Sequence, residues 1–294
     1  MKKIKISGSN IFLSIIFILL LLYTLVTLFP LFWGVLTSLK SPEEFRLNII
    51  GFPEHWEFGN YSYVLSSFSV TVTDSSGFPI EFGILDMLGN SILYVIGCSF
   101  FGTLVPCVMA YLNTKFDYKF NKVIYTIVII TMILPIVGSA PSELRILRAL
   151  GMYDTIWGLW IQRSHFLGMY FLVFHAMFRG LPRDMSEAAY MDGASEMTTF
   201  LKIMMPLAKN AFFSVMLVLA IGYWNDYQGP ILYMPSHPTL ATALFDLSFS
   251  RANELNNVPM RMAGCFMLML PVLILFLCFH NKLMGNLTMG SVKE

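Results

Sequence analysis

The most regular polar pattern in the chain combines one carboxylate with two small residues and then continues at fixed spacing: Glu187-Ala188-Ala189, three residues, Gly193, nine residues, Ile203, two residues, Pro206. A single carboxylate can make an oriented, charge-assisted contact with a partner. Adjacent alanines leave a smooth face that the cleft of another protein can approach closely. We therefore expect a docking surface here rather than a catalytic site.

The surrounding residues predict two short helices that would position this surface. Pro182 suits a first helical turn, since proline lacks the amide hydrogen that this turn leaves unpaired, and Gly193 suits a helix end. Arg183 lies four residues before Glu187, close enough on one face to form an ion pair. Ser195 can cap a second helix. The apolar residues of that helix recur at helical spacing and can pack under the first helix: Phe200, Ile203, Met204 and Leu207.

The pattern resembles the cytoplasmic coupling motif of permease subunits in binding-protein-dependent ABC importers. That motif runs E-A-A, three residues, G, nine residues, I-x-x-P. It usually has leucine before the proline, where this chain has Met205, a residue of similar volume and apolarity. The alternative is an ordinary cytoplasmic loop with two short helices. The resemblance implies that the following residues contact an ATPase subunit: Glu187, Ala188, Ala189, Asp192, Gly193, Ile203 and Pro206.

The composition predicts a polytopic membrane protein of the all-α class. Hydrophobic residues make up 56% of the 294 residues, charged residues make up 13%, and the mean hydropathy is +0.66. A soluble domain of this length does not normally have such values. Apolar runs predict six transmembrane helices: residues 11–36, 88–112, 123–136, 166–178, 210–223 and 262–280. Residues 142–161 carry charges and tryptophans and are expected to form an interfacial helix.

Six crossings place both chain ends on one side of the bilayer, and the basic residues indicate which side. The N-terminus, residues 115–122, the segment around Glu187 and the C-terminal tail hold most of the 19 basic residues, so they are expected to face the cytoplasm. The resemblance implies a single domain over residues 1–294 in the bacterial cytoplasmic membrane. Its expected parts are a permease core at about 86–280, external loops at 37–87 and 224–261, and a coupling loop at 180–208.

The chain lacks the sequence motifs of ATP hydrolysis and of metal chemistry. The phosphate-binding pattern G-x-x-x-x-G-K-S/T is absent, and so are H-E-x-x-H and G-x-S-x-G. No catalytic residue, metal site or cofactor is therefore predicted, and the nucleotide of an ATP-driven transporter would belong to a separate subunit. The four cysteines lie within apolar runs and are interpreted as small hydrophobic residues: Cys98, Cys107, Cys265 and Cys278.

Residues 222–230 mix aromatic, amide and acidic side chains at the outer end of the fifth predicted helix. Aromatic faces stack on the apolar faces of sugars, and amides and carboxylates hydrogen-bond to hydroxyl groups. The segment therefore suits a carbohydrate path, and an interfacial belt of aromatic residues explains it equally well. The resemblance favours the carbohydrate path, for which the expected residues are Tyr223, Trp224, Asn225 and Asp226.

Further segments are similar to the maltose-type group of these permeases. They are Gly51-Phe52-Pro53, Asn60-Tyr61, Asn90-Ser91 and the tail from Phe279 to Lys293. This resemblance implies import of a sugar, expected to be an oligosaccharide. The implied partners are a second homologous permease, two cytoplasmic ATP-binding subunits, the lipid bilayer and an extracellular binding protein, which is expected to contact residues 240–257. No nucleic acid partner is expected.

Three other interpretations remain open. A secondary transporter or channel would need no partner subunits, but it leaves the spacing around Glu187 unexplained. An intramembrane enzyme would need converging acid, base or metal ligands, which the scattered histidines do not supply. The same ATP-driven machinery could also carry a polar solute other than a sugar.

Overall fold

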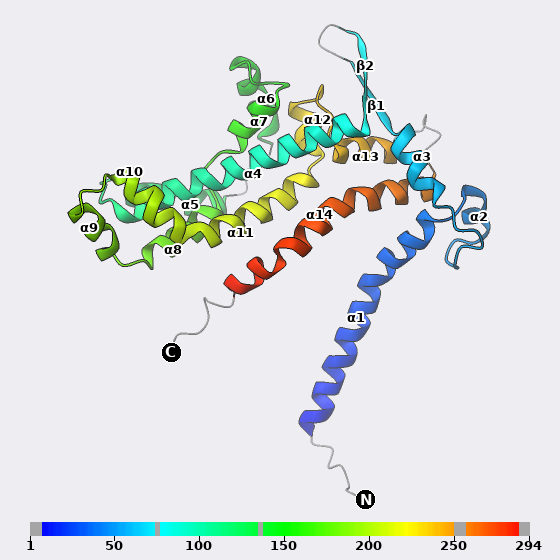
Figure 1. Ribbon diagram of the computed structural model, residues 1–294, viewed down its shortest axis with the longest axis horizontal. Coiled ribbons are helices and arrows are strands. Elements are labelled where there is room, and N and C mark those ends of the chain that lie inside the picture. Colours follow the sequence, from blue (N-terminus) through cyan, green and yellow to red (C-terminus); the bar gives the residue numbers. More distant parts are fainter. Residues whose placement is uncertain (1–7, 74–76, 135–137, 250–256, 288–294) are drawn as a thin grey trace, which may run out of the picture. The chain divides into compact units, whose positions relative to one another are not determined.

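The structure is a computed structural model that describes residues 8–73, 77–134, 138–249 and 257–287 (Figure 1). Helices form most of the described chain, and its strands pair as one short hairpin. The chain divides into two compact units. The first comprises residues 1–68 and 246–269, and the second comprises residues 69–245 and 270–294.

The first unit contains helix α1 (Gly8–Ser38), whose long apolar sequence suits a lipid environment. Near its end, α1 packs against helix α14 (Val258–Leu287). A Cβ atom added at Gly34 would lie only 3.1 Å from the ring of Phe266. Glycine therefore allows the two helices a close approach, as small residues commonly do in membranes.

Two short helices, α2 (Pro42–Leu47) and α3 (Gly59–Ser67), also belong to the first unit. Lys40 is fully buried, and its ammonium group donates a hydrogen bond to the Asn48 carbonyl at the end of α2 (2.6 Å). This contact satisfies a backbone acceptor that a helix end leaves unpaired. The side chain of Asn60 donates to the carbonyl of Lys40 (2.8 Å), so polar contacts hold this part of the predicted external loop together.

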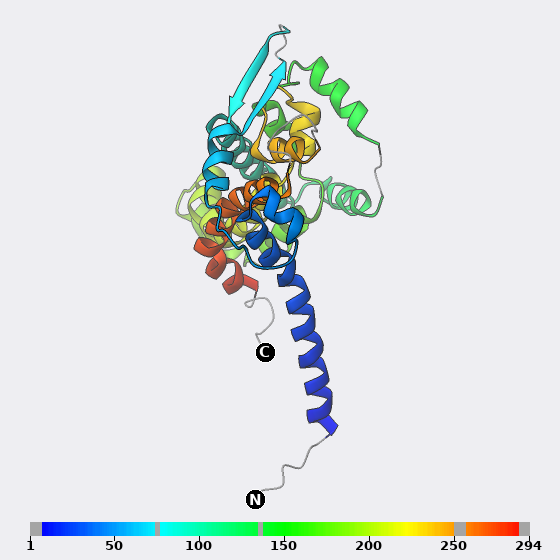
Figure 2. The same ribbon diagram turned by 90° about the vertical axis from the view of Figure 1, so that its right-hand side faces the viewer.

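The second unit begins with an antiparallel hairpin of strands β1 (Ser69–Thr73) and β2 (Pro79–Gly83). The hairpin extends away from the start of helix α4 (Ile84–Lys115), as Figures 1 and 2 show. The described chain is mostly helical, as predicted, and the hairpin at residues 69–83 is an element that the all-α prediction did not include. The alternating pattern in each strand covers only five residues, which is a weak signal in a chain dominated by long apolar runs.

The remaining helices are mostly short. In chain order they are α5 (Asn121–Ile133), α6 (Ala140–Ala149), α7 (Ile156–Arg163), α8 (Met169–Arg179), α9 (Asp184–Met191), α10 (Glu196–Thr199), the π-helical turn η1 (Phe200–Met204), α11 (Met205–Trp224), α12 (Gln228–Tyr233) and α13 (Leu240–Phe249). Helix α4 packs against α7, α8 and α11 and is central to the second unit.

Small and aromatic side chains fill the core between these helices. The buried residues include Cys107, Ala110, Phe171, Phe174, Phe178, Ala208 and Phe212. Large rings fit against small side chains there, and partly buried leucine, isoleucine and methionine side chains pack around them. Cys98 is buried as well, and both α4 cysteines lie where a small hydrophobic residue is expected.

Within the part of the chain that the structure describes, four helical stretches are long and apolar enough to cross a membrane: Phe12–Ser38, Ile84–Lys115, Glu196–Trp224 and Val258–Cys278. The other two predicted crossings coincide with α5 and α8, which have 13 and 11 residues. A membrane-spanning helix usually needs about 20 residues. The predicted crossing at 123–136 also includes residues 135 and 136, which lie outside the described residues.

The fifth predicted crossing begins earlier than residue 210. Helices α10, η1 and α11 form one continuous stretch, Glu196–Trp224, which Ser195 caps as predicted. Within it, Pro206 has no amide hydrogen to donate. The helix widens into a π turn immediately before this proline, where the Met205 N–H donates to the Phe200 carbonyl. The second short helix and the crossing are therefore one element.

Candidate functional site

The segment from α9 to η1, residues 184–204, contains most of the pattern that begins at Glu187, and we call it the α9–η1 segment. Helix α9 ends at Met191, and two residues later Gly193 adopts a positive φ of 79°. The Gly193 N–H donates to the Tyr190 carbonyl (3.0 Å), and the Ala194 N–H donates to the Ala189 carbonyl (2.9 Å). These two bonds form a Schellman motif, which favours glycine at this position. The prediction that Gly193 ends a helix is confirmed.

The α9–η1 segment exposes much of its surface. Glu187, Ala188 and Asp192 are exposed, Ala189 is buried and Ile203 is half-buried, while Pro206, just beyond the segment, is exposed. Large apolar side chains are also exposed: Met185, Met191, Met197 and Leu201. Met191 is the extreme case, with 87% of its surface exposed. A polar segment that leaves several methionines exposed resembles an adaptable binding surface.

The end of α4 holds this segment in place. The buried ring of Tyr111 packs against the rings of Phe178 and Phe200, with centroids 5.5 and 4.7 Å away. One helical turn later, the Lys115 ammonium group donates to the Leu181 carbonyl (2.7 Å). The start and the end of the α9–η1 segment are therefore both fastened to one helix.

The expected ion pair between Arg183 and Glu187 is wrong. The guanidinium group of Arg183 instead faces the Asp117 carboxylate, with Nη2 3.3 Å from Oδ1. Asp117 lies 66 residues earlier in the chain and just after α4, so local spacing could not indicate it. Both side chains are largely exposed, and such a pair adds little stability.

A cavity of about 720 Å³ opens at the other end of α11. Its lining residues are Arg163, Tyr170, Val218, Leu219, Gly222, Tyr223, Asn225, Asp226, Tyr227 and Gln228. We call this the polar cavity. Three of the four predicted path residues therefore line one space: Tyr223, Asn225 and Asp226. The fourth, Trp224, is only 9% exposed and does not belong to the lining.

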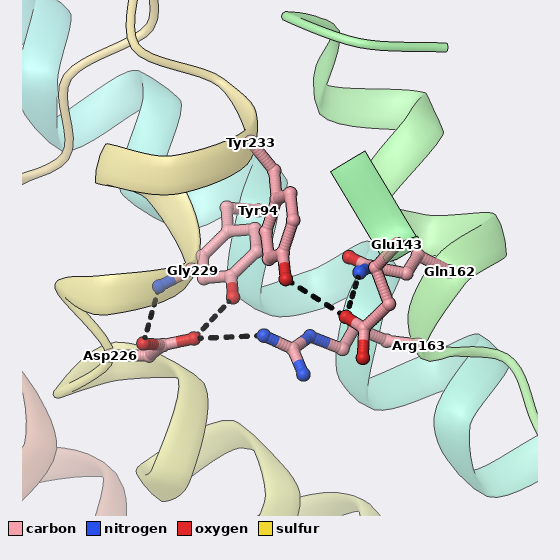
Figure 3. Close-up of polar contacts among 7 residues, drawn as sticks. All are labelled: Tyr94, Glu143, Gln162, Arg163, Asp226, Gly229 and Tyr233. Atoms are coloured by element: carbon pink, nitrogen blue, oxygen red, sulfur yellow. Dashed lines mark hydrogen bonds and ion pairs between the residues drawn. The ribbon is translucent and has the colours of Figure 1, made fainter. Parts of the chain in front are cut away.

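Asp226 lies at the centre of a polar cluster beside the cavity (Figure 3). Its Oδ2 accepts a hydrogen bond from the Tyr94 hydroxyl (2.8 Å) and faces Arg163 Nη2 at 3.6 Å. Its Oδ1 accepts a hydrogen bond from the Gly229 N–H (2.9 Å). A Cβ at Gly229 would lie 2.6 Å from Asp226 Oδ2, so only glycine leaves room for this cluster. Helices α4, α7 and α12 thus meet at one carboxylate.

Glu143 forms a second set of contacts next to this cluster (Figure 3). Its Oε2 accepts hydrogen bonds from Gln162 Nε2 (2.8 Å) and from the Tyr233 hydroxyl (2.9 Å). A hydrogen bond from Ser139, followed by those from Tyr233 and Gln162, holds the pKa of Glu143 below its usual value against the opposing effect of burial. These contacts join α6 and α7 to α12.

Three residues at this site, Arg163, Tyr94 and Tyr170, are not among those predicted from the sequence. Arg163 follows the segment that is interpreted from sequence as an interfacial helix, and Tyr94 and Tyr170 lie within predicted crossings. An arginine at the end of a tryptophan-containing segment is the one sequence signal that could have identified Arg163. Within the described ranges, no three His, Cys, Asp or Glu side chains are grouped to hold a metal ion.

Comparison with known proteins identifies the family. Residues 102–281 match the family described as binding-protein-dependent transport system inner membrane component. This chain belongs to that family. The family resemblance deduced from the Glu187 pattern is thereby confirmed, and the chain is a multi-pass component of the bacterial inner membrane. The family works with a solute-binding protein and ATPase components in ABC importers.

Several known permeases are similar to this chain over nearly its whole length. The diacetylchitobiose uptake system permease protein NgcG of Streptomyces coelicolor is 24% identical over 292 residues, which cover 98% of this chain and 91% of the relative. The arabinooligosaccharides transport system permease protein AraQ of Bacillus subtilis is 29% identical, with 98% of each chain covered. The melibiose/raffinose/stachyose import permease protein MelC of Bacillus subtilis is 26% identical, with 90% and 91% covered.

A solved structure shares the fold of this permease. It comes from a bacterial ABC transporter involved in the import of the acidic polysaccharide alginate. The TM-score is 0.71 and the sequence identity is 23%, and the match covers 94% of this chain and 98% of the other. At 23% sequence identity, this similarity supports the fold of the chain and carries no conclusion about its solute.

Proposed function

We propose that this permease imports an oligosaccharide as one of two membrane subunits of an ATP-driven importer. The observation that carries the proposal is the match to the inner membrane component family over residues 102–281. Relatives of nearly equal length are named for diacetylchitobiose, arabinooligosaccharides and melibiose or raffinose, which are all neutral sugars. A cavity lined by aromatic, amide and charged side chains suits such a solute.

In this proposal the α9–η1 segment is the docking surface for an ATPase subunit. The residues proposed to form the contact are Glu187, Ala188, Ala189, Asp192, Gly193, Ile203 and Pro206. Exposed methionines around Glu187 would supply the apolar area that a stable contact needs, and the carboxylate would orient it. The attachment to α4 supports a mechanical role, since a force on the segment reaches a long helix directly.

The proposed topology has six crossings with both chain ends in the cytoplasm, as one domain over residues 1–294. Four crossings are the long apolar stretches, and α5 and α8 supply the others. Short helices can serve where neighbouring helices cover their ends, and α8 packs closely on α4. Tyr223, Asn225 and Asp226 would lie on the solute path at the outer end of α11.

The proposed complex contains this permease, a second homologous permease, two cytoplasmic ATPases and an extracellular binding protein. The binding protein would contact residues 240–257, of which 250–256 lie outside the described residues. ATP-driven closure of the two ATPases would move the α9–η1 segment and shift the permease between outward-open and inward-open states.

Purification in mild detergent tests the proposal. The permease is tagged at its C-terminus in its own cells, and co-eluting proteins are identified by mass spectrometry. We expect an ATPase with a phosphate-binding loop and a second permease, and uptake assays with the purified complex then identify the oligosaccharide. Recovery of this chain alone or as a homo-oligomer would contradict the proposal and favour a secondary transporter.

Reversing the charge at Glu187 tests the docking surface. Glu187→Arg should lower solute uptake about tenfold or more, because a charge-assisted contact in an interface is replaced by a repulsive or misplaced one. Glu196→Arg is the matched control, since Glu196 is also exposed on the α9–η1 segment but lies outside the pattern. Expression and membrane insertion should be unchanged in both. Uptake by Glu187→Arg at the level of Glu196→Arg would exclude the proposed role.

A further inference from the structure

Arg163 has more hydrogen-bonding capacity than its contacts use. A guanidinium group carries five N–H donors. Among the described residues, the polar contact of this group is Nη2 facing Asp226 Oδ2 at 3.6 Å, a long and single-oxygen contact. Its Nε is buried and has no hydrogen-bond partner there. About a third of the Arg163 side chain remains exposed, and it lines the polar cavity. Donors are therefore available to a molecule in the cavity.

In contrast to Arg163, Asp226 has protein partners on both oxygens of its side chain. Its Oδ1 accepts the Gly229 N–H at 2.9 Å, and its Oδ2 accepts the Tyr94 hydroxyl at 2.8 Å and faces Arg163. Both carboxylate oxygens are thus engaged by the protein. Two of its roughly four acceptor sites hold hydrogen bonds and a third faces the guanidinium group, so less capacity remains for a solute than at Arg163. It is placed to hold the guanidinium group (Figure 3).

The charges of the lining limit the kind of solute. Arg163 and Asp226 are the two side chains of acidic or basic type in the lining, and they face each other as an ion pair. A solute carboxylate would compete with Asp226 for the guanidinium group and be repelled by it. Two adjacent hydroxyl groups of a neutral solute can instead accept hydrogen bonds from the unused N–H groups of Arg163, and the ion pair with Asp226 stays in place.

The rest of the lining fits the same chemistry. Tyr170 and Tyr223 provide aromatic rings, and Asn225 and Gln228 provide amides. Rings cover the apolar face of a pyranose or furanose, and amides bind its hydroxyl groups. The cavity, at about 720 Å³, is large enough for a small oligosaccharide.

We propose that Arg163 binds adjacent hydroxyl groups of a neutral saccharide in the polar cavity and that Asp226 is the residue that positions it. This inference rests on the proposed function and adds the residue that contacts the solute and the charge class of that solute. It also changes the role expected for Asp226, which acts through Arg163 rather than on the solute itself.

Protection of an introduced thiol measures binding in the cavity directly. The four native cysteines are replaced by alanine, and Gln228→Cys places a reporter in the lining. Val218→Cys is a second reporter for the case in which the Gln228 amide is itself needed. The assembled importer in membrane vesicles reacts with a hydrophilic methanethiosulfonate, and the rate is measured with raffinose, arabinotriose, diacetylchitobiose or trigalacturonate present.

At least one neutral probe should slow the labelling, and trigalacturonate should not. Arg163→Gln should raise the saccharide concentration needed for half-protection about tenfold or more, because a charged hydrogen-bond donor is lost. Arg163→Lys should recover only part of the affinity, since an ammonium group lacks the planar fork. Asp226→Asn leaves the charge of Arg163 uncompensated, so trigalacturonate should now protect. A purely structural role for the pair would not produce this change in preference.

The opposite results overturn the inference. The inference is wrong if no neutral probe slows the labelling, or if trigalacturonate slows it more than the neutral probes do in the importer with the native Arg163–Asp226 pair. It is also wrong if neutral probes protect the Arg163→Gln importer at the same concentrations as the importer with Arg163. The proposed function fails separately, if no ATPase co-purifies or the complex takes up no saccharide. An importer that co-purifies with its ATPase and transports a neutral saccharide equally well with Arg163→Gln would contradict the inference about Arg163 alone.

Discussion

The α9–η1 segment and the polar cavity depend on the same helix but are held by different forces. At one end of α4, the segment is fastened by the packing of Tyr111 against aromatic rings and by a hydrogen bond from Lys115 to a backbone carbonyl. Nearer the other end, Tyr94 reaches into the cavity cluster through a hydrogen bond to Asp226. Tyr94 and Tyr111 are about 25 Å apart along the helix.

The difference fits the role that we propose for each region. A docking surface has to keep its shape while part of it stays exposed, and ring packing together with backbone caps does this without using its outer side chains. A solute cavity needs polar groups that can exchange partners, so its contacts are between side chains. One rigid helix between the two regions can carry movement from one to the other.

Removing the ring at Tyr111 should have the largest effect on stability and should act on the α9–η1 segment. Tyr111→Ala leaves a void among Phe116, Phe178 and Phe200, and comparable substitutions cost about 3 kcal/mol or more. Thermal unfolding of the purified complex should shift to lower temperature, and protease cleavage near Met191 should become faster. Tyr111→Phe retains the ring and is the control. Equal loss in both variants would mean that the hydroxyl group, rather than the packing, matters.

Removing the hydroxyl group of Tyr94 should have a smaller effect, confined to the cavity. Tyr94→Phe deletes one hydrogen bond to a carboxylate, worth about 1.5–3 kcal/mol in the folded state. Asp226 then holds Arg163 less firmly, so the half-saturation concentration for uptake should rise while ATP hydrolysis without solute stays unchanged. Tyr118→Phe, at an exposed position, serves as control. A change in ATP hydrolysis without a change in half-saturation would argue that Tyr94 acts on coupling instead.

The α9–η1 segment and the polar cavity also differ in how well the sequence predicts them. The end of α9 depends on local geometry, because Gly193 adopts a positive φ within its own helix cap, and the spacing around Glu187 predicts it. The cavity depends on contacts between distant residues: Tyr94 and Asp226 are 132 positions apart. One sequence can indicate that residues 222–230 are unusual, but it cannot indicate that Arg163 lies beside them.

The predictions that differ from the structure do so because they depend on contacts between residues that are distant in the sequence, or on where a helix begins and ends. Arg183 has two carboxylates within reach of its loop, and tertiary structure rather than helical spacing selects Asp117. The apolar content of residues 166–178 indicates a crossing, yet α8 has 11 residues because Gly168 and Gly180 bound it. Hydropathy describes the environment of a segment well and its helical limits poorly.

The smallest expected effect concerns pH and the contacts of Glu143 next to the cavity. Hydrogen bonds from Ser139, Tyr233 and Gln162 lower the pKa of Glu143, so they stabilise the folded protein while this carboxylate is ionised. This contribution is fully present above the pKa of an unfolded glutamate, about 4.3, and is lost as the pH falls through the lower pKa of the folded state.

We therefore expect the melting temperature of wild type to exceed that of Glu143→Gln at pH 6 and the difference to shrink between about pH 5 and pH 3. Differential scanning fluorimetry of the purified complex across this range measures it. Glu196→Gln, which removes a carboxylate from the exposed α9–η1 segment, controls for the change in net charge. A difference that stays constant with pH would mean that the pKa of Glu143 is the same in the folded and the unfolded protein. The contacts that join α6 and α7 to α12 would then depend on shape and not on charge, as the packing around Tyr111 does.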